Sequence, residues 1–320
     1  MRIDPQIRAL REDEVSRRAI QARLERVRKD WLEGPAASLG SEFAAYGEGA
    51  ALEKCETLSS LFDCPRIAAH LVRTLVDPMM EAVCGNPLGH VPLRHQFSDK
   101  LSVIELMKSG RAALTLLTYD ELDIEPASAS FSGGERNELV LAGAADIAMV
   151  ELLEERDGRA ALELAHRRLV EGELLRCKSG MTTRLVKKVH GRLVLLRLAR
   201  SEESAIETRQ YRLSDGRLLH RASGSREESR REMAMALLGR MGRKDAAPLL
   251  AELAMEGSAH IRWQSLRECL ALDSGAGFAA LGEIAARPSD DLAMPAGALR
   301  ARLIEAYPQL VEKEESECPA

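Results

Sequence analysis

The chain has 320 residues, of which 45% are hydrophobic and 30% are charged, and its formal net charge is −5. This length allows two or three domains with cores of their own, and the composition is that of an ordinary soluble protein. A negative net charge gives no long-range attraction for polyanions, and aromatic residues are too few, at 3%, to favour stacking on bases. We therefore expect no nucleic-acid partner.

The six cysteines are scattered along the chain and form no C-x-x-C pair. Their spacing suits neither a zinc site nor a disulfide framework, so we expect reduced thiols. The first residues are charged, and no run of about 18 apolar residues occurs, which predicts neither a secretion signal nor a membrane span. The sequence thus predicts a cytoplasmic protein with no membrane partner.

Residues 1–95 are predicted to form a helical N-terminal region. Between Pro5 and Leu32, apolar side chains recur every three to five residues and trace one face of a helix. A second helical stretch is expected from about Leu52 to Val83. These helices would form a cap, an arm or a dimer contact.

Residues 96–224 change to short candidate strands separated by turn signals. The candidates run from LSVIELM at Leu101 to RLLHRA at Arg217, with turns such as Asp157-Gly158 and His190-Gly191 between them. About ten short strands at this spacing predict an all-β sandwich or barrel.

Residues 225–312 return to a helical pattern that contains an internal repeat. The segment that starts at Arg230 aligns with the segment that starts at Ile261, at an offset of 31 residues, and most aligned positions are small or apolar. Each unit is predicted to be two short helices around a polar turn and resembles a HEAT repeat. Such stacks usually serve recognition, so we expect a protein partner or a second copy to bind helical segments. Residues 313–320 are predicted to form a polar tail.

The most informative motif is GELLRCKSGMTTRLVK, which begins at Gly172. It resembles the second conserved motif of the cupin family, G-x5-P-x-G-x2-H-x3-N. Gly172 and Gly180 stand at the two glycine positions, and Thr183 stands where the family has a metal-binding histidine. Lys178 and Lys187 replace the proline and the asparagine.

This resemblance covers roughly residues 101–222 and implies a double-stranded β-helix, or jelly roll. In the family, two histidines and a glutamate of a first motif bind a metal together with the histidine of the second. Here the match to the first motif is SFSGGERNELVLAG, in which Glu138 is nearest the glutamate position, and no histidine lies between His95 and His166. One carboxylate cannot form such a site, so the resemblance implies a degenerate cupin-like barrel with no metal or other cofactor.

If the frame of the barrel is kept, Glu138 and Thr183 point inward near the positions of the lost ligands. Arg136, Arg176 and Arg184 are then candidates to bind an anionic ligand, because a guanidinium matches a carboxylate or a phosphate. In the competing interpretation, Thr183 bonds a neighbour in a filled core and the arginines are solvated. The sequence marks no catalytic residue.

The sequence thus predicts an α+β multidomain protein with N-terminal helices, a central all-β cupin-like jelly roll and C-terminal HEAT-like repeats. The leading hypothesis is a non-catalytic binding or regulatory module for a small anionic ligand, or for none, with a helical protein-interaction domain. The alternative is a metal-dependent cupin enzyme, of oxygenase or isomerase type, with non-standard ligands.

Overall fold

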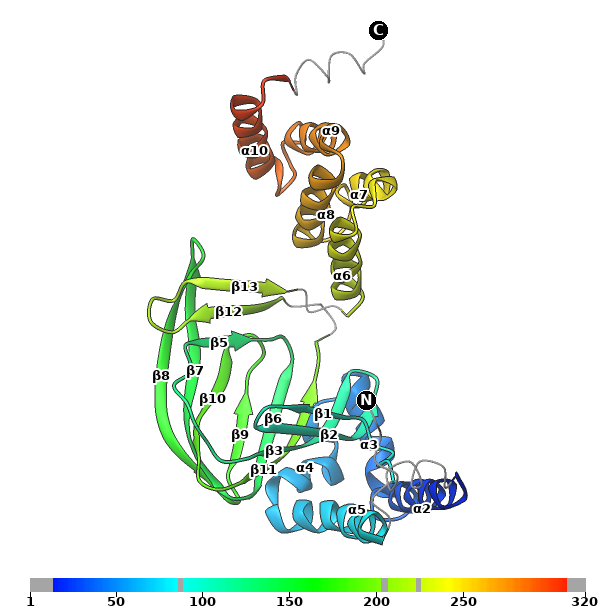
Figure 1. Cartoon of the computed structure of the whole chain (residues 1–320). Coiled ribbons are helices and arrows are strands. Elements are labelled where there is room, and N and C mark those ends of the chain that lie inside the picture. Colours follow the sequence, from blue (N-terminus) through cyan, green and yellow to red (C-terminus); the bar gives the residue numbers. More distant parts are fainter. Residues whose placement is uncertain (1–13, 86–88, 203–206, 223–225, 310–320) are drawn as a thin grey trace, which may run out of the picture. The chain divides into compact units, whose positions relative to one another are not determined.

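The computed structural model of the chain describes residues 14–85, 89–202, 207–222 and 226–309 (Figure 1). The chain divides into two compact units, Met1–Arg221 and Ala222–Ala320. The first unit contains the N-terminal helices and the strands, and the second contains the C-terminal helices. None of the described helices has the length and apolar character that crossing a membrane requires.

The helices that precede the sheets are α2 (Glu14–Glu33), α3 (Ala37–Glu48), the short 3-10 helix η1 (Leu52–Lys54), α4 (Glu56–Asp63) and α5 (Pro65–Gly85). The chain turns between α2 and α3 at Gly34-Pro35. Helix α5 starts at Pro65, a position at which the missing N–H of proline costs no helical hydrogen bond. Helices α2 and α5 are joined by the buried indole of Trp31, whose Nε1 donates to the carbonyl oxygen of Leu71 at 3.0 Å.

Three antiparallel sheets follow. The six-stranded sheet contains, in order across it, β1 (His95–Ser98), β2 (Leu101–Ser109), β3 (Ala112–Tyr119), β11 (Leu193–Arg200), β6 (Glu135–Ala142) and β9 (Leu174–Cys177). The four-stranded sheet contains β4 (Leu122–Asp123), β10 (Thr182–Val189), β7 (Ala144–Arg156) and β8 (Arg159–Val170). The three-stranded sheet contains β13 (Leu218–Ala222), β12 (Thr208–Arg212) and β5 (Ser128–Phe131).

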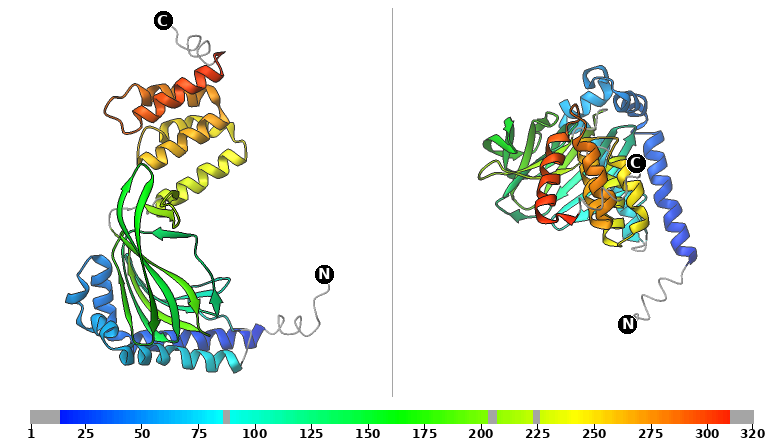
Figure 2. Two further views of the ribbon diagram at one scale, coloured as in Figure 1. Left: turned by 90° about the vertical axis from the view of Figure 1, so that its left-hand side faces the viewer. Right: turned by 90° about the horizontal axis from the view of Figure 1, so that it is seen from above.

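The two larger sheets form a sandwich. The N-terminal helices, blue in Figure 2, cover the outer face of its six-stranded sheet. Successive side chains of a strand point to opposite faces, and β6 uses this alternation. Val140 belongs to the apolar core between the sheets, together with Ile147 of β7. Its neighbour Leu139 belongs to the core shared with the helices, together with Phe43 and Leu75.

A glycine is required where the chain leaves one sheet for the other. Gly143 lies between β6 and β7 with φ +88°. A Cβ there would lie 1.9 Å from the carbonyl oxygen of Arg192, so any side chain would collide with backbone as well as strain the φ angle.

The second unit consists of α6 (Arg226–Arg240), η2 (Lys244–Ala246), α7 (Ala247–Leu253), α8 (Ala259–Leu272), α9 (Ser274–Ala285) and α10 (Ala293–Ala306). The pairs α6–α7 and α8–α9 lie over the two segments that align in the sequence at an offset of 31 residues. Leu250 and Leu281 hold equivalent positions in the two units, and both are fully buried.

The predicted fold class is confirmed: N-terminal helices, a central β-sandwich and C-terminal helices follow one another along the chain. The domain boundary predicted after residue 224 and the predicted tail at 313–320 lie outside the described residues. The helices of residues 14–85 share an apolar core with the six-stranded sheet, and the extent of each domain stays a prediction.

The two repeat units differ at an arginine, which gives a matched test of stability. The side chain of Arg262 is 11% exposed, donates from Nε to the carbonyl oxygen of Ala254 at 3.0 Å, and pairs with Asp290 through both terminal nitrogens, at 3.1 and 2.5 Å. The equivalent Arg231 is exposed and pairs with Glu227 one helical turn away.

We expect Arg262→Ala to lower the free energy of unfolding by about 2 kcal/mol, because it removes hydrogen bonds to a charged, largely covered carboxylate. Arg231→Ala should cost less than about 1 kcal/mol, since exposed ion pairs contribute little. Denaturant titrations of both variants in a Trp31→Phe background, where Trp263 is the remaining tryptophan, measure the difference. Equal losses would contradict the structural role assigned to Arg262.

Candidate functional site

The two motif glycines lie in turns at either end of β9. Gly172 precedes this strand with φ +85°, and Gly180 follows it with φ +62°. Both angles fall in the left-handed region that glycine adopts without strain. The spacing of the two glycines is therefore set by the length of one short strand and its turns.

A buried carboxylate lies between the two larger sheets. Glu138 of β6 is 1% exposed and accepts hydrogen bonds from two arginines. The Nε of Arg197, on the neighbouring strand β11, is 2.5 Å from its Oε1. The Nε of Arg184, on β10 of the opposite sheet, donates to its Oε2. The Arg184–Glu138 pair therefore joins the two sheets through the middle of the sandwich.

Arg184 has a second partner on the six-stranded sheet. Its guanidinium carbon lies 5.5 Å from the ring centroid of Tyr119, and its Nη2 lies 3.4 Å from the tyrosine hydroxyl. The arginine side chain is only 5% exposed. A cation held against an aromatic face in this way is stabilised by the charge distribution of the ring.

Arg136 approaches the same region from β6, two residues before Glu138. Its Nη2 lies 3.4 Å from the carbonyl oxygen of Thr182 and 3.5 Å from the hydroxyl of Thr183. Its Nε is buried, and no hydrogen-bond partner for that nitrogen occurs among the residues that the structure describes. Buried donors of native proteins are nearly always paired, so this nitrogen lacks a partner that a ligand or a water can supply.

Of the five residues named from the sequence, four lie close together in the sandwich and one does not. The contacts above pair Arg136 with Thr183 and Arg184 with Glu138, and Arg136, Glu138 and Arg184 all lie within electrostatic range of Cys177. Arg176 of β9 points away: its side chain is 67% exposed and its Nη2 lies 3.8 Å from Asp63 of α4.

The electrostatics of the cluster follow from burial and from its excess of arginines. Burial alone would raise the pKa of Glu138, but Arg184 and Arg197 together lower it to about 2. Burial alone would lower the pKa of Arg184, yet Glu138 and Tyr119 raise it. Both groups therefore stay charged at neutral pH.

The buried thiol of Cys177 lies on β9, within electrostatic range of Arg136, Glu138, Arg184 and Arg197. Burial raises the pKa of this thiol, and the neighbouring arginines do not reverse the effect. A protonated thiol is a poor nucleophile and a poor metal ligand.

Arg197 and Tyr119 were not among the residues predicted from the sequence. Arg197 had a detectable signal: it follows Leu193 and Leu195 at two-residue spacing, so an apolar strand face ends in a charge. Tyr119 had none, because its place beside Arg184 depends on how the two sheets face each other.

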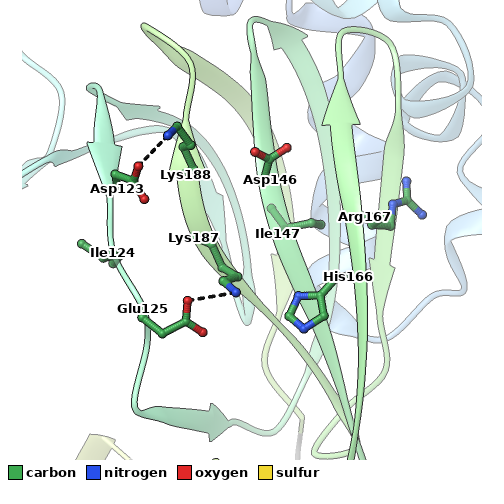
Figure 3. Close-up of a pocket in the computed structure, with 9 residues that line it drawn as sticks. All are labelled: Asp123, Ile124, Glu125, Asp146, Ile147, His166, Arg167, Lys187 and Lys188. Carbon is green, nitrogen blue, oxygen red and sulfur yellow. Dashed lines mark hydrogen bonds and ion pairs between the residues drawn. The ribbon is translucent and has the colours of Figure 1, made fainter.

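One pocket, of about 540 Å³, lies on the four-stranded sheet (Figure 3). Both lysines that line it are paired with acidic residues on and just after β4: Lys188 Nζ lies 2.5 Å from Asp123, and Lys187 Nζ lies 2.9 Å from Glu125. The hydrogen bond to Asp123 raises the pKa of Lys188. These pairs join the short edge segment to β10, so the charges already serve a structural role.

A second pocket, of about 670 Å³, lies where helix α3 meets the loops at one end of the sheet and is lined in part by Glu135, Arg200 and Lys178. The hydroxyl of Tyr46 donates to Glu135 at 2.7 Å, and Arg200 pairs with the same carboxylate at 2.6 Å. Burial, and then the bond to Glu135, raise the pKa of Tyr46. This partly buried arrangement fastens α3 to the sheet.

No group of three or more His, Cys, Asp or Glu side chains within the described ranges is placed to hold a metal ion. The carboxylate of Glu138, predicted to be nearest the glutamate position of the cupin motif, is bound by two guanidiniums, which compete with any cation for its oxygens.

No protein-family model matches the chain, and no curated protein matches it. Solved structures do match. A CENP-C cupin domain from Drosophila melanogaster is 14% identical and the match covers 37% of this chain and 91% of that one, with a TM-score of 0.28. A putative mannose-6-phosphate isomerase from Ralstonia eutropha JMP134 is also 14% identical, with 35% and 93% covered and a TM-score of 0.26. A cupin superfamily protein from Desulfitobacterium hafniense DCB-2 is 17% identical, with 33% and 83% covered and a TM-score of 0.23. Likeness at this level supports no conclusion about activity.

The depressed pKa of Glu138 makes the stability of the sandwich depend on pH. The folded value, about 2, is below the ordinary value of 4.5. The stabilisation is therefore complete above the unfolded pKa and is lost as pH falls from about 4.5 towards 2. We expect Glu138→Gln to lower the free energy of unfolding at neutral pH by about 3–5 kcal/mol, because two guanidiniums lose their anion.

Urea titrations at several pH values measure this, with Glu151→Gln on the exposed part of β7 as the control. The difference between the wild type and Glu138→Gln should shrink as pH falls below about 4.5, whereas the control should follow the wild type throughout. A difference that does not change with pH would show that the charge of Glu138 contributes nothing.

Proposed function

We propose that the β-sandwich is a non-catalytic, cupin-like module that binds a small anion, a carboxylate or a phosphate, between its two larger sheets. The observation that carries the proposal is the excess of positive charge in the interior. Two guanidiniums, those of Arg184 and Arg197, bind the single carboxylate of Glu138. A third, that of Arg136, lies with them within electrostatic range of Cys177, so three positive charges face one negative charge in this region. Buried charges are costly unless paired, so an anionic ligand would stabilise this arrangement.

Arg136 is the arginine best suited to contact the ligand. The Nε of Arg184 and the Nε of Arg197 each donate a hydrogen bond to Glu138. Arg136 instead makes long contacts, at 3.4 and 3.5 Å, and its Nε has no partner among the described residues. A guanidinium offers two parallel N–H donors to a carboxylate or phosphate. Arg136 can thus hydrogen-bond to the anion, while the positive charges of Arg184 and Arg197 attract it electrostatically.

The properties of the acidic groups in the cluster support a binding role rather than catalysis. Glu138 is held as an anion by two arginines, which makes it a weak base, and the thiol of Cys177 is held in its neutral form. General acid–base catalysis favours groups whose pKa is near the working pH, and the pKa of Glu138 is displaced away from it.

The alternative is a metal-dependent cupin enzyme with non-standard ligands. It requires Glu138 to exchange its two arginines for a cation. Stoichiometric metal in the purified full-length protein, lost in Glu138→Gln, would favour this alternative over the anion-binding module.

Isothermal titration of the full-length protein with inorganic phosphate and with malonate tests the anion site. We expect Arg136→Gln to weaken binding by about tenfold or more, since it removes a charge-assisted hydrogen bond. Arg176→Gln is the matched control, because Arg176 is exposed and points away from the cluster. Thermal unfolding curves establish that both variants are folded.

The proposal would be contradicted if neither phosphate nor malonate bound at millimolar concentration. Equal losses in Arg136→Gln and Arg176→Gln would do the same, because they would indicate a general surface-charge effect.

We also propose that the second unit is a short HEAT-like stack that binds another protein. Its two helix pairs follow the sequence repeat, and repeat stacks present extended surfaces that commonly serve recognition. Several large apolar side chains of this unit are exposed: Met233, Leu237, Met241, Leu249 and Met294. Exposed apolar surface of this kind is typical of interaction sites.

A displayed library of helical peptides, selected on the full-length protein, tests the docking role. Hydrogen exchange of each complex should show protection within residues 226–309. Selected peptides that protect only the sandwich, or a library that yields none, would contradict a docking role for the helical unit.

A further inference from the structure

Helix α6 carries apolar side chains on two opposite faces. Met235 is 2% exposed and belongs to an apolar core of the second unit, together with Ile261 of α8. Met233, Leu237 and Met241 follow one another at four-residue spacing and are 65%, 58% and 58% exposed. Met241 continues the helical geometry just past α6, since its N–H donates to the carbonyl oxygen of Leu237 at 2.9 Å. We call these three residues the α6 stripe.

A surface helix normally carries polar residues on the face that points away from its core. The α6 stripe departs from this rule, because Met233 and Leu237 lie on the face opposite to Met235. Side chains four residues apart are neighbours on a helix surface, so the stripe forms one continuous apolar ridge.

The second repeat shows that apolar residues at the positions of Met233 and Leu237 are not needed to build a repeat unit, although Met241 corresponds to the buried Leu272. At the offset of 31 residues, Met233 corresponds to Gln264 and Leu237 to Glu268. On α8 these two side chains are polar and bond to each other, with the amide of Gln264 donating to Glu268 at 2.8 Å. Apolar residues at these positions are therefore peculiar to α6.

The stripe has a basic border. Arg230 lies one turn before Met233, Arg240 lies beside Met241, and both arginines are exposed. Two acidic residues near the stripe already have partners: Glu227 pairs with Arg231 at 2.6 Å, and Glu232 lies 3.3 Å from His260. The surface around the stripe thus combines apolar side chains with positive charge.

We propose that the α6 stripe binds an amphipathic helix of a partner protein whose apolar face is bordered by acidic residues. This inference rests on the proposed docking role of the second unit and names its surface and its partner. The apolar ridge matches helix-against-helix recognition through residues at helical spacing, and Arg230 and Arg240 select for an acidic border. A second copy of α6 is a poorer partner, because it would bring two basic borders together.

Two designed, fluorescently labelled peptides test the inference on the full-length protein. Both present the same leucine stripe, one bordered by Glu and the other by Lys, and fluorescence anisotropy reports binding. We expect the Glu peptide to bind and the Lys peptide to bind at least about tenfold more weakly, because its border repels Arg230 and Arg240.

Leu237→Gln should weaken binding of the Glu peptide by about tenfold or more, since it breaks the ridge at its centre. Arg240→Gln should weaken it less and should reduce its dependence on salt. Met294→Gln is the matched control, because Met294 is 86% exposed and lies on α10. Circular dichroism verifies that each variant keeps its helices.

Equal binding of the two peptides, or equal effects of Leu237→Gln and Met294→Gln, would overturn the inference. Sedimentation showing a dimer that Leu237→Gln converts to a monomer would also overturn it, because the occupant would then be a second copy. If library peptides protect residues 226–309 but ignore Leu237→Gln, the docking role stands and the α6 stripe is not its surface.

Discussion

The ion pair between Arg184 and Glu138 is the interaction on which the β-sandwich and its proposed role both depend. It crosses the interior from the four-stranded to the six-stranded sheet, and Arg197 adds a second positive charge on the same carboxylate from the next strand. Removing ions from water costs several kcal/mol each, so an apolar pair of similar volume would be at least as stabilising there. We interpret the presence of charged groups at this depth as evidence of a functional role. The excess of arginines over carboxylates suggests that this role is the binding of an anion.

The order of elements was predictable because it depends on local patterns. Glycine-containing turns between short apolar runs mark the strands, and the repeated spacing of apolar residues after Arg230 marks the helix pairs. The way in which strands combine was not predictable. Strand β11 lies between β3 and β6, and nothing in the local pattern of RLVLLRLA specifies those neighbours.

The candidate site was predicted in part, for the same reason. Glu138 and Arg184 were found through a family motif, and the structure brings them together. Arg176 was found in the same way, yet strand alternation turns it outward beside Asp63. Tyr119 contacts Arg184 only because two sheets pack face to face, a relation between residues far apart in the chain.

The position of β11 also governs how the protein can be made. The strand spans Leu193–Arg200, so β3 and β6 have no common neighbour until that part of the chain has left the ribosome. Leu196 and Leu198 of β11 belong to the core that also buries Phe43 of α3. During synthesis β2, β3 and β6 can cover part of the apolar face of the N-terminal helices, but the share that Leu196 and Leu198 cover stays open until a strand that is translated more than a hundred residues later. Growing chains of this protein are thus expected to need protection from aggregation until translation has passed residue 200.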